Sequence, residues 1–415
     1  MWTPDLPPAP HRHLCTDCGV SRSQDPKRCA QACQFIQPDY PTHELRVHGR
    51  TRHLQRDAQH LHDEVFFGPH RRMLQASLSP AQEGAQWTGI TTRVAERLLE
   101  TGDVDAVITM TADPQDAWRP RPVIVTQPAD LAKCRGMRMG YAPLVALIEP
   151  ALKQGLRRLA VIAIPCQVYA LRALQAQWER EHGLTRLVVI GIPCSDNTTT
   201  ERFHEFLALV APEPQEVTYL EFRADYHVEI RTRQGSVRRI PFLNLPLSQL
   251  PADFFPLTCR TCVDYTNSLS DLTVGYMGGR GEQWLIVRNE EGERLLSLIE
   301  SELKCVPPSS AGERFGAVQG FIRNLERSAG GLPLRRMPQW LRPLVSWLMP
   351  RFGPRGLEFA RARVQMKAAE TVINLRRDSP HRIKHMVPAH VWSLVRVHGY
   401  EPQAHESHPP STPSR

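Results

Sequence analysis

Two short apolar runs in this chain end in the same tripeptide. Residues 158–166, RLAVIAIPC, align with residues 186–194, RLVVIGIPC, so that each run finishes at Ile-Pro-Cys. Both runs are β-branched and nearly continuous in apolar residues, which is typical of strands buried on both faces of a parallel sheet. The polar segment 168–181 between them has room for a crossover helix. The repeat therefore predicts a β-α-β unit.

Strands joined in this way run parallel, so we expect Cys166 and Cys194 at the same carboxyl edge of one sheet. Open α/β sheets hold their ligands at that edge. Pro165 and Pro193 cannot donate to a sheet ladder, and we expect them to end the strands and turn the thiols outward. A single cysteine in such a place would be interpreted as a small buried hydrophobe. The repeat favours a paired, functional role instead.

The remaining patterns predict an α/β fold, α+β overall, with a mostly parallel sheet core and an inserted antiparallel hairpin. A helix is expected over 90–100 and 143–154, and strands over 104–110 and 123–126. Residues 215–245 alternate apolar and polar side chains around a Gln-Gly turn, which predicts the hairpin. The expected organisation is a Cys-rich segment 1–45, an α/β core 60–212, a hairpin and Cys-pair region 213–290, a mostly helical region 291–400 and a disordered tail 401–415.

Composition limits the function classes only weakly. The net charge is +8, from 51 basic and 43 acidic residues without a long basic block. This balance suits an acidic protein, an anionic cofactor or a membrane surface, and the chain lacks the aromatic and basic interleaving of single-strand nucleic-acid binders. We expect no nucleic-acid partner. The sequence leaves open whether the chain forms a homo-oligomer.

The amino-terminal residues show no secretory signal, so we expect a cytoplasmic protein. No run of 18 apolar residues exists, and no transmembrane segment is expected. The segment 340–352, WLRPLVSWLMPRF, is interpreted first as a helix packed on the core. Contact with a membrane interface, which would make the protein peripheral to a membrane, and a wall for a large apolar substrate are the alternatives.

Ten cysteines in a reducing compartment point to metal or redox chemistry. Four of them fall within 19 residues near the start, and a Cys-x-x-Cys pair stands alone near residue 260. That pair together with Cys166 and Cys194 completes a second four-thiolate site, for which zinc and an iron-sulfur cluster both remain open. Cys134 and Cys305 are interpreted as ordinary thiols. The expected metal ligands are Cys15, Cys18, Cys29, Cys33, Cys166, Cys194, Cys259 and Cys262.

The turn EGAQWTG at 83–89 leads into the helix expected over 90–100. It is neither a Walker loop nor a dinucleotide fingerprint. At a helix start it can bind a pyrophosphate through backbone N–H groups and the hydroxyls of Thr88, Thr91 and Thr92. Capping of the helix by Thr88 is the alternative interpretation.

Several blocks together resemble the coenzyme F420 hydrogenase/dehydrogenase β-subunit family, and within it the ferredoxin-dependent reductases of chlorophyll metabolism. The blocks are EGAQWTGITTRVAERLLETGDVDAVI, RGMRMGYAP, IPCQVYALRALQ, IPCSDN, CRTCVDYTNSLSDLTVGYMG and GPRGLEFARARV. They span nearly the whole chain, from Cys15 to Pro388. The family's usual opening looks like Cys-x-x-Cys-Gly-x-Cys, and Ser21 stands here at the third cysteine, so that Cys29 beside Cys33 is the expected substitute.

This resemblance implies one FAD, two 4Fe-4S clusters and reduced ferredoxin as electron donor. It places one cluster on the amino-terminal cysteines and the other on the two Ile-Pro-Cys cysteines with the later Cys pair, beside the flavin. The residues that it implies for flavin binding are Gln86, Trp87, Thr88, Gly89, Thr91, Thr92, Arg121, Arg138, Pro165 and Gln167.

The implied reaction reduces the C8 vinyl group of 3,8-divinyl chlorophyllide or its protochlorophyllide precursor to ethyl. Removal of the hydroxymethyl oxygen at position 7 of a chlorophyll is the alternative within the same branch. A zinc-stabilised, basic binding protein without redox chemistry is the alternative from another class. No residue stands out as the proton donor; Asp113, Asp264 and His385 are the candidates.

Overall fold

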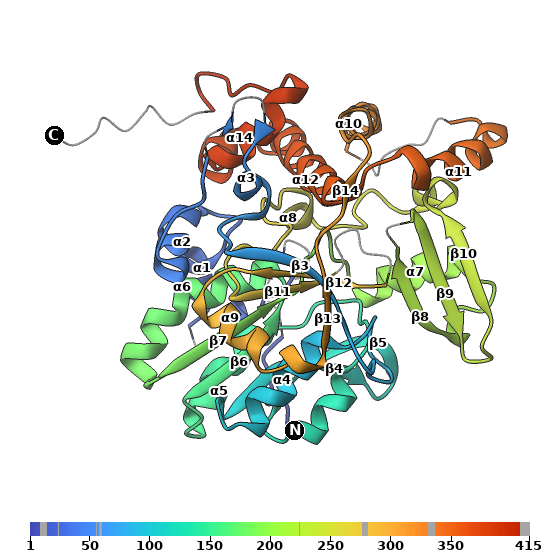
Figure 1. The fold of residues 1–415 in the computed structure, drawn as a ribbon. Helices are drawn as coiled ribbons and strands as arrows, with labels where there is room; N and C mark the ends of the chain where they lie inside the picture. The colour runs from blue at the N-terminus through green and yellow to red at the C-terminus, as the bar shows by residue number, and fades with distance from the viewer. Residues whose placement is uncertain are drawn as a thin grey trace.

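The computed structural model describes the chain except residues 9–14, 24, 55, 58–59, 224, 276–280, 331–336 and 407–415, and the side chains at 56, 57 and 60. Most of the expected tail, 401–415, therefore lies outside the described residues. An eight-stranded sheet forms the centre of the molecule (Figure 1). In sheet order its strands are β13 (Leu303–Val306), β3 (Arg72–Leu78), β12 (Gln283–Val287), β11 (Leu272–Gly275), β7 (Arg186–Gly191), β6 (Arg158–Ala163), β4 (Ala106–Asp113) and β5 (Asp116–Val125).

The four central strands of this sheet, β11, β7, β6 and β4, run parallel. Strands β6 and β7 pair with Arg158 opposite Arg186 and Ala163 opposite Gly191, so the sequence repeat coincides with the register of the ladder. The expected parallel core and β-α-β unit are confirmed. The outer strands β12, β3, β13 and β5 pair antiparallel.

Helices cover both faces of the sheet. The α-helices are α1 (Cys29–Ala32), α2 (Tyr40–His48), α3 (Asp63–Phe67), α4 (Ile90–Glu100), α5 (Ile148–Lys153), α6 (Pro165–His182), α7 (Thr200–Val210), α8 (Leu257–Arg260), α9 (Glu290–Ser297), α10 (Phe315–Ser328), α11 (Arg342–Phe352), α12 (Leu357–Asp378), α13 (Ile383–Met386) and α14 (Ala389–Val395). The helix expected over 90–100 is α4, which has the expected bounds. The helix expected over 143–154 is instead the 3₁₀ turn η4 (Leu144–Leu147) followed by α5.

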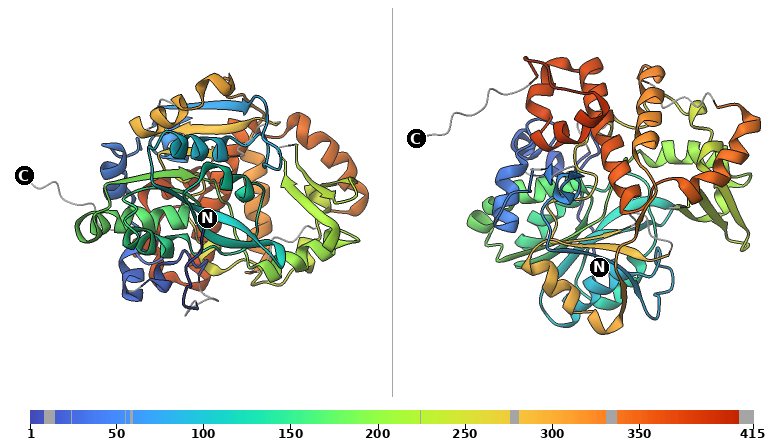
Figure 2. Two further views of the ribbon diagram at one scale, coloured as in Figure 1. Left: turned by 90° about the horizontal axis from the view of Figure 1, so that it is seen from below. Right: turned by 45° about the horizontal axis from the view of Figure 1, so that its top comes forward.

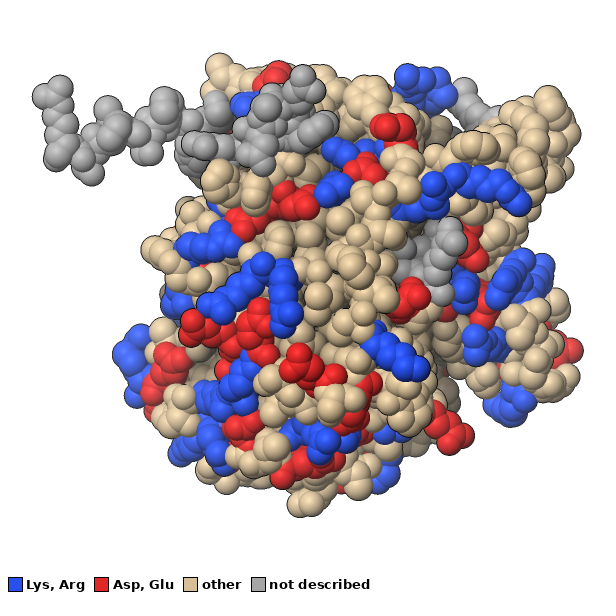
Figure 3. All heavy atoms as spheres, viewed as in Figure 1, with Lys and Arg blue, Asp and Glu red and all other residues tan. Residues whose placement is uncertain are grey.

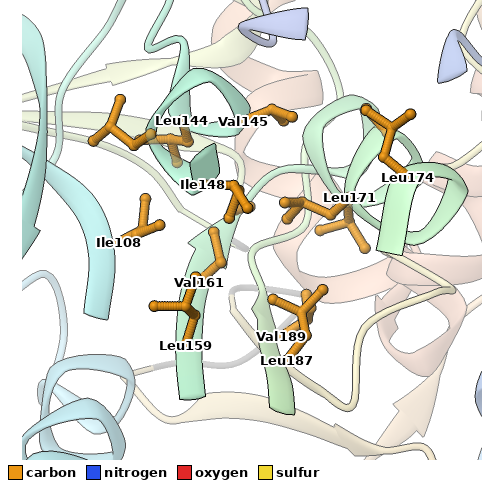
Figure 4. Packing of buried hydrophobic residues seen from close by; sticks show 14 of the residues in the cluster. Ile108, Leu144, Val145, Ile148, Leu159, Val161, Leu171, Leu174, Leu187 and Val189 are labelled. Atoms are coloured by element: carbon orange, nitrogen blue, oxygen red, sulfur yellow. The ribbon is translucent and has the colours of Figure 1, made fainter. Parts of the chain in front are cut away.

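Alternate side chains of the central strands point to opposite faces, as the pleat requires. Leu159 and Val161 of β6 pack against η4, α5 and α6, and Figure 4 shows this cluster, in which Leu171 of α6 faces the strands. Ala160 and its neighbours pack on the other face, against α4 and α9. Because both faces are covered, the strands are apolar throughout, and this is the pattern that the repeat displays.

A separate three-stranded antiparallel sheet comprises β8 (Val217–Phe222), β9 (His227–Thr232) and β10 (Val237–Pro241), and it lies at the right of Figure 1. Strands β9 and β10 are the hairpin expected around the Gln-Gly turn, and β8 extends it. Helix α7 and Trp118 pack on its apolar face. Short two-residue ladders join β1 (Arg56–Asp57) to β2 (His60–Leu61) and β14 (Ser310–Ala311) to β15 (Arg355–Gly356).

The carboxyl-terminal helices gather above the carboxyl edge of the parallel strands, and Figure 2 shows them from two further directions. Helices α3, α10, α12 and α14 share one core, which also includes Trp284 of β12. Helix α11 differs, because Leu344, Trp347 and Phe352 are exposed and only Ser346 is buried, so the interpretation of 340–352 as a core helix is wrong. Among the described residues, no helix is both long and apolar enough to cross a membrane.

Candidate metal centre

The two Ile-Pro-Cys turns and the Cys-x-x-Cys loop meet at the carboxyl edge of β6 and β7. Cys166 is the second residue of α6, and Cys194 follows β7 after Ile192 and Pro193. Cys259 lies in α8, and Cys262 is the second residue after the end of that helix. These four cysteines, the second set, line one small cleft together with Thr16, Phe35, Ile164, Pro165, Ser195, Asp196 and Asn197. The structure thus brings together the cysteines that the sequence paired.

A buried asparagine holds the two strand ends beside each other. The Asn267 side-chain nitrogen donates to the carbonyl oxygens of Ala163 and Ile192, at 2.8 and 3.3 Å. These carbonyls belong to β6 and to the residue after β7, so one side chain fixes the spacing of both Cys-bearing turns. Asn267 adopts a positive φ of 61°, which asparagine tolerates better than most residues. The sequence analysis assigned no role to this residue, although it lies in the block CRTCVDYTNSLSDLTVGYMG that carries part of the family resemblance.

The long helix α12 supports the Cys-x-x-Cys loop from behind. The Thr371 hydroxyl donates to the Cys262 carbonyl at 2.7 Å, and the Asn374 side chain donates to the Arg260 carbonyl at 3.0 Å. On the same helix, Lys367 donates to Asp196 at 2.6 Å and to Glu370 at 2.8 Å. Burial alone would lower the pKa of Lys367, but the two carboxylates outweigh it and raise that pKa. A charged lysine paired with carboxylates, one of them the cleft residue Asp196, therefore lies beside the second set.

The amino-terminal cysteines, the first set, are folded by short turns. Residues 20–22 form η1 (Val20–Arg22), residues 26–28 form η2 (Pro26–Arg28), and α1 begins at Cys29. Electrostatic interactions connect Cys18 to Cys29 and Cys33, and connect Cys15 to both as well. Ser21 lies within η1, at the position where the resemblance had led us to look for a third cysteine. Cys29 and Cys33 therefore accompany Cys15 and Cys18, as expected.

The two sets adjoin each other at Cys166. Its sulfur lies 3.4 Å from the Thr16 hydroxyl, and Thr16 is the residue after Cys15. Cys166 interacts electrostatically with Cys18 and Cys33 of the first set and with Cys194 of the second. Cys166 therefore lies between the two sets, at the place where the amino-terminal segment packs on the sheet edge.

Backbone N–H groups point at the sulfur atoms in both sets. The amides of Asp17 and Asn197 donate to the sulfurs of Cys15 and Cys259, each at 3.4 Å. Such hydrogen bonds are a recurrent feature of thiolates that hold iron-sulfur clusters. Burial raises the pKa of Cys166 to about 11 and of Cys262 to about 12, so free thiols here stay protonated and metal binding must release their protons.

Thiols with backbone N–H donors beside them are chemically suited to hold a thiolate-ligated metal centre, and both sets have this composition. In the described part of the chain, however, no group of three or more His, Cys, Asp or Glu side chains is arranged closely enough to hold a metal ion.

The loop expected to bind flavin contacts two other segments. The Gln86 side chain donates to the Leu220 carbonyl of β8 at 3.5 Å, and the Trp87 indole donates to Glu221. Arg135 donates to the Glu83 carbonyl at 3.1 Å, which ties this loop to residues 135–138. Among the described residues, the buried Gln86 Oε1 and Arg138 Nε atoms have no hydrogen-bond partner. Two residues expected at the flavin thus have unsatisfied polar atoms, which fits an anionic or polar cofactor.

Residues 138–142 run from this loop to the second set. The Asn197 side chain, whose backbone N–H faces Cys259, donates to the Gly140 carbonyl at 2.9 Å. Gln167, next to Cys166, donates to the Ala142 carbonyl at 2.6 Å. One short segment therefore links the expected flavin residues to the thiols.

The other residues expected at the flavin have varied surroundings. Thr88 does not cap α4: its hydroxyl accepts from the Leu78 N–H and donates to Gln283, and Gly89 with a φ of 94° is the N-cap. The capping interpretation of Thr88 is wrong, because Gly89 alone makes the left-handed turn into the helix. Thr91 and Thr92 lie half-buried in the first turn of α4, Pro165 lines the cleft of the second set, and Arg121 is exposed on β5.

Gln167 also has a structural role, since its side-chain oxygen accepts the Ile164 N–H at 3.0 Å and completes the start of α6.

The three candidate proton donors do not line the cleft. Asp113 accepts a turn N–H from Gln115, and His385 is exposed on α13. Asp264 is buried, which raises its pKa, but its oxygens accept the Ser268 N–H and hydroxyl. Cys134 is half-buried, and Cys305 is exposed on β13.

Two family models match this chain, and both describe the coenzyme F420 hydrogenase/dehydrogenase beta subunit. The model for the N-terminal part of that subunit matches residues 73–149, and the model for its C-terminal part matches residues 156–310. The two matches together cover more than half of the chain. This chain belongs to the coenzyme F420 hydrogenase/dehydrogenase β-subunit family. The resemblance inferred from the sequence blocks is thereby confirmed.

Two curated relatives match nearly the whole chain, and a third matches about half of it. An uncharacterised protein of Nostoc sp. is 33% identical over 387 residues, 93% of this chain and 94% of the relative. The chloroplastic 7-hydroxymethyl chlorophyll a reductase of Oryza sativa subsp. japonica is 32% identical over 413 residues, 95% of this chain and 85% of the relative. A subunit of the F420H2 dehydrogenase of Methanosarcina mazei is 26% identical over 237 residues, 55% and 63% of the two chains.

A solved structure shares the fold. A chain of the xenon-derivatised F420-reducing [NiFe] hydrogenase complex from Methanosarcina barkeri superposes with a TM-score of 0.54 at 19% identity, covering 75% of this chain and 92% of that one. The named relatives are reductases, dehydrogenases and hydrogenases, all of them oxidoreductases.

Proposed function

We propose that this protein is a ferredoxin-dependent reductase of a chlorophyll-type tetrapyrrole, with an FAD and two 4Fe-4S clusters. The observation that carries the proposal is the arrangement of the second set of four cysteines around one cleft, with the amino-terminal segment that bears the first set packed beside Cys166. The relative from Oryza sativa, named for a chlorophyll reductase and similar over 95% of this chain, supports the substrate class.

The chain offers a linear order of sites. Thr16, the residue after Cys15 of the first set, contacts Cys166, the second set lines the adjoining cleft, and residues 138–142 lead from there to Gln86 and Arg138. When bound at these sites, iron-sulfur clusters and a flavin would turn the single electrons of ferredoxin into a two-electron reduction. Each intended substrate needs two electrons and two protons, which a single-electron donor cannot deliver in one step.

The chain's own residues position and insulate this path. Asn267 and α12 fix the spacing of the thiols, and burial of the second set limits the access of water to it. Lys367 pairs with Asp196 and Glu370, and this buried charge cluster holds the Asp196 segment against the cleft of the second set. The net charge of +8 suits docking of an acidic ferredoxin.

Two reactions remain to be separated by experiment. Reduction of the C8 vinyl group of 3,8-divinyl (proto)chlorophyllide to ethyl adds two electrons and two protons across a C=C bond. Reduction of a 7-hydroxymethyl group to methyl uses the same electrons and protons and releases water. We propose the vinyl reaction, on the weight of the sequence blocks, and the name of the relative from Oryza sativa makes the hydroxymethyl reaction the second candidate.

The deciding experiment is anaerobic. Freshly purified protein is assayed for iron, sulfide and flavin, then given reduced ferredoxin with divinyl chlorophyllide in one reaction and 7-hydroxymethyl chlorophyll a in another. We expect about eight irons and one FAD per chain. The vinyl reaction gives a product with a blue-shifted Soret band, because the macrocycle loses one conjugated double bond.

Each outcome has one meaning. Turnover of only the hydroxymethyl substrate would replace the first reaction by the second. About four irons would mean that the first set, with Ser21, holds no cluster. A colourless protein with zinc and no flavin would refute the redox proposal and favour a zinc-stabilised binding protein. We propose a cytoplasmic location, peripheral to membranes that carry the pigment substrate.

A further inference from the structure

Four large apolar side chains of helix α11 and of the preceding turn η9 (Gln339–Leu341) are exposed, whereas Leu341, Leu348 and Met349 are half-buried. Trp340, Leu344, Trp347 and Phe352 have exposed fractions of 78%, 53%, 55% and 71%. The first three follow at intervals of four and three residues and therefore form one stripe along the helix. The buried residue of α11 is Ser346. The helix thus has an apolar face that the rest of the protein leaves uncovered.

The segment around the stripe is basic and contains no acidic residue. From Arg327 to Leu357 the sequence has six arginines and neither Asp nor Glu. Arg351 is exposed, and its guanidinium carbon lies 4.1 Å from the centroid of the Trp347 ring. In Figure 3 the uncharged surface at the upper right is bordered by blue Lys and Arg side chains. An occupant of this face must therefore accept apolar side chains and carry negative charge.

The stripe is held in place by the body of the protein. The Tyr226 hydroxyl donates to the Pro354 carbonyl at 2.5 Å, just beyond the end of α11. Helix α11 also packs on η6 (Phe242–Asn244), the turn that follows β10. The aromatic side chains are therefore presented by a fixed, protruding helix at the edge of the molecule (Figures 1 and 2).

We propose that this face, comprising Trp340, Leu344, Trp347, Phe352 and Arg351, docks the protein on the surface of an anionic lipid bilayer. Tryptophan rings favour the boundary between lipid headgroups and acyl chains. Helices with Trp, Leu and Phe on one side and arginines beside them lie in the plane of that boundary. The eleven residues of α11 are too few to span a bilayer, so the contact is peripheral.

The observations favour a bilayer over an acidic electron-donor protein. A donor must come close to the thiols, whereas α11 lies above the three-stranded sheet and α8, with Cys259, lies at the centre of the molecule (Figure 1). A protruding row of bulky apolar side chains also suits insertion into a deformable lipid surface better than contact with a flat, charged protein surface. The inference goes beyond the proposed reaction, because it depends on α11 alone.

The test is sedimentation of the purified, cofactor-loaded protein with vesicles. One set of vesicles contains phosphatidylglycerol mixed with phosphatidylcholine, and the other contains phosphatidylcholine alone. We expect binding to the first set at low salt, weakened about tenfold by Trp347→Ser because an inserted indole is lost. Arg351→Gln should weaken it about fivefold, and that loss should shrink at high salt. Leu45→Ser removes an equally exposed leucine on α2 and should change nothing.

Three results would overturn the proposal. The first is absence of vesicle binding by the wild-type protein. The second is equal binding by wild type, Trp347→Ser and Leu45→Ser. The third is a wild-type dimer that Trp347→Ser converts to a monomer, which would mean that a second copy covers the face. Iron and flavin content, measured on each variant, separates these results from failure of the proposed reaction, since none of the substitutions touches the thiols.

Discussion

Replacing Cys259 with serine should remove one metal centre and leave the other intact. The Cys259 thiol is buried beside Cys194 and Asp196, within the second set of cysteines. Each 4Fe-4S cluster is held by four thiolates, so loss of one ligand from a set of four should lower the iron content from about eight to about four per chain. The flavin content should stay the same.

Cys166→Ser is the sharper variant of the same experiment. Its sulfur adjoins Thr16 and the first set as well as Cys194, so this change should remove about four irons and also shift the electron paramagnetic resonance spectrum of the remaining cluster. Cys259→Ser should leave that spectrum unshifted. Cys305→Ser is the matched control, because this thiol is exposed on β13 and should retain all of the iron. Equal iron loss in Cys305→Ser and Cys259→Ser would refute the assignment of ligands.

Two further predictions concern stability, each measured as the free energy of unfolding in urea. Lys367→Met should lower the free energy of unfolding by about 3–5 kcal/mol, because it leaves the carboxylates of Asp196 and Glu370 buried without their cation. The control is Lys133→Met at an exposed lysine, which should change the free energy of unfolding by less than about 0.5 kcal/mol. Burial lowers the pKa of His48 to about 3. Between about pH 6.5 and pH 3, this histidine is therefore protonated in the unfolded chain and neutral in the native chain. The free energy of unfolding should fall as the pH falls through that range. His48→Gln should flatten this dependence between about pH 7 and 5, and an unchanged slope would mean that other groups cause it.

The position of the second set could be predicted because local rules determine it. Parallel neighbouring strands end at the same edge, so a repeated strand ending was enough to bring Cys166 close to Cys194. The Cys-x-x-Cys loop was then the only remaining pair with suitable spacing. The amino-terminal thiols lie close in sequence, and short turns suffice to gather them.

The supporting residues could not be predicted in this way. Lys367 meets Asp196 across 171 positions of sequence, and Asn267 reaches Ala163 across 104. Such contacts depend on where α12 and the loop after Cys262 pack relative to the sheet. Short-range sequence patterns do not predict that packing. The antiparallel strands β12, β3 and β13 were missed for the same reason. For α11 the composition misled, because Trp and Leu at helical spacing indicate a buried face and do not say what covers it.

The two Ile-Pro-Cys copies have the same sequence but different continuations, and this difference explains their separate roles. After Ile164 the chain enters α6 at once, so Cys166 lies at a helix N-terminus, where backbone N–H groups favour a thiolate. After Cys194 the chain continues without a helix until α7 begins at Thr200. In this segment Asp196 accepts a hydrogen bond from Lys367, and the Asn197 N–H donates to the Cys259 sulfur. The first copy therefore faces the amino-terminal set, while the second closes the site around α8. A repeat with identical continuations would place two helix starts at the edge and leave no segment to reach the Cys-x-x-Cys loop.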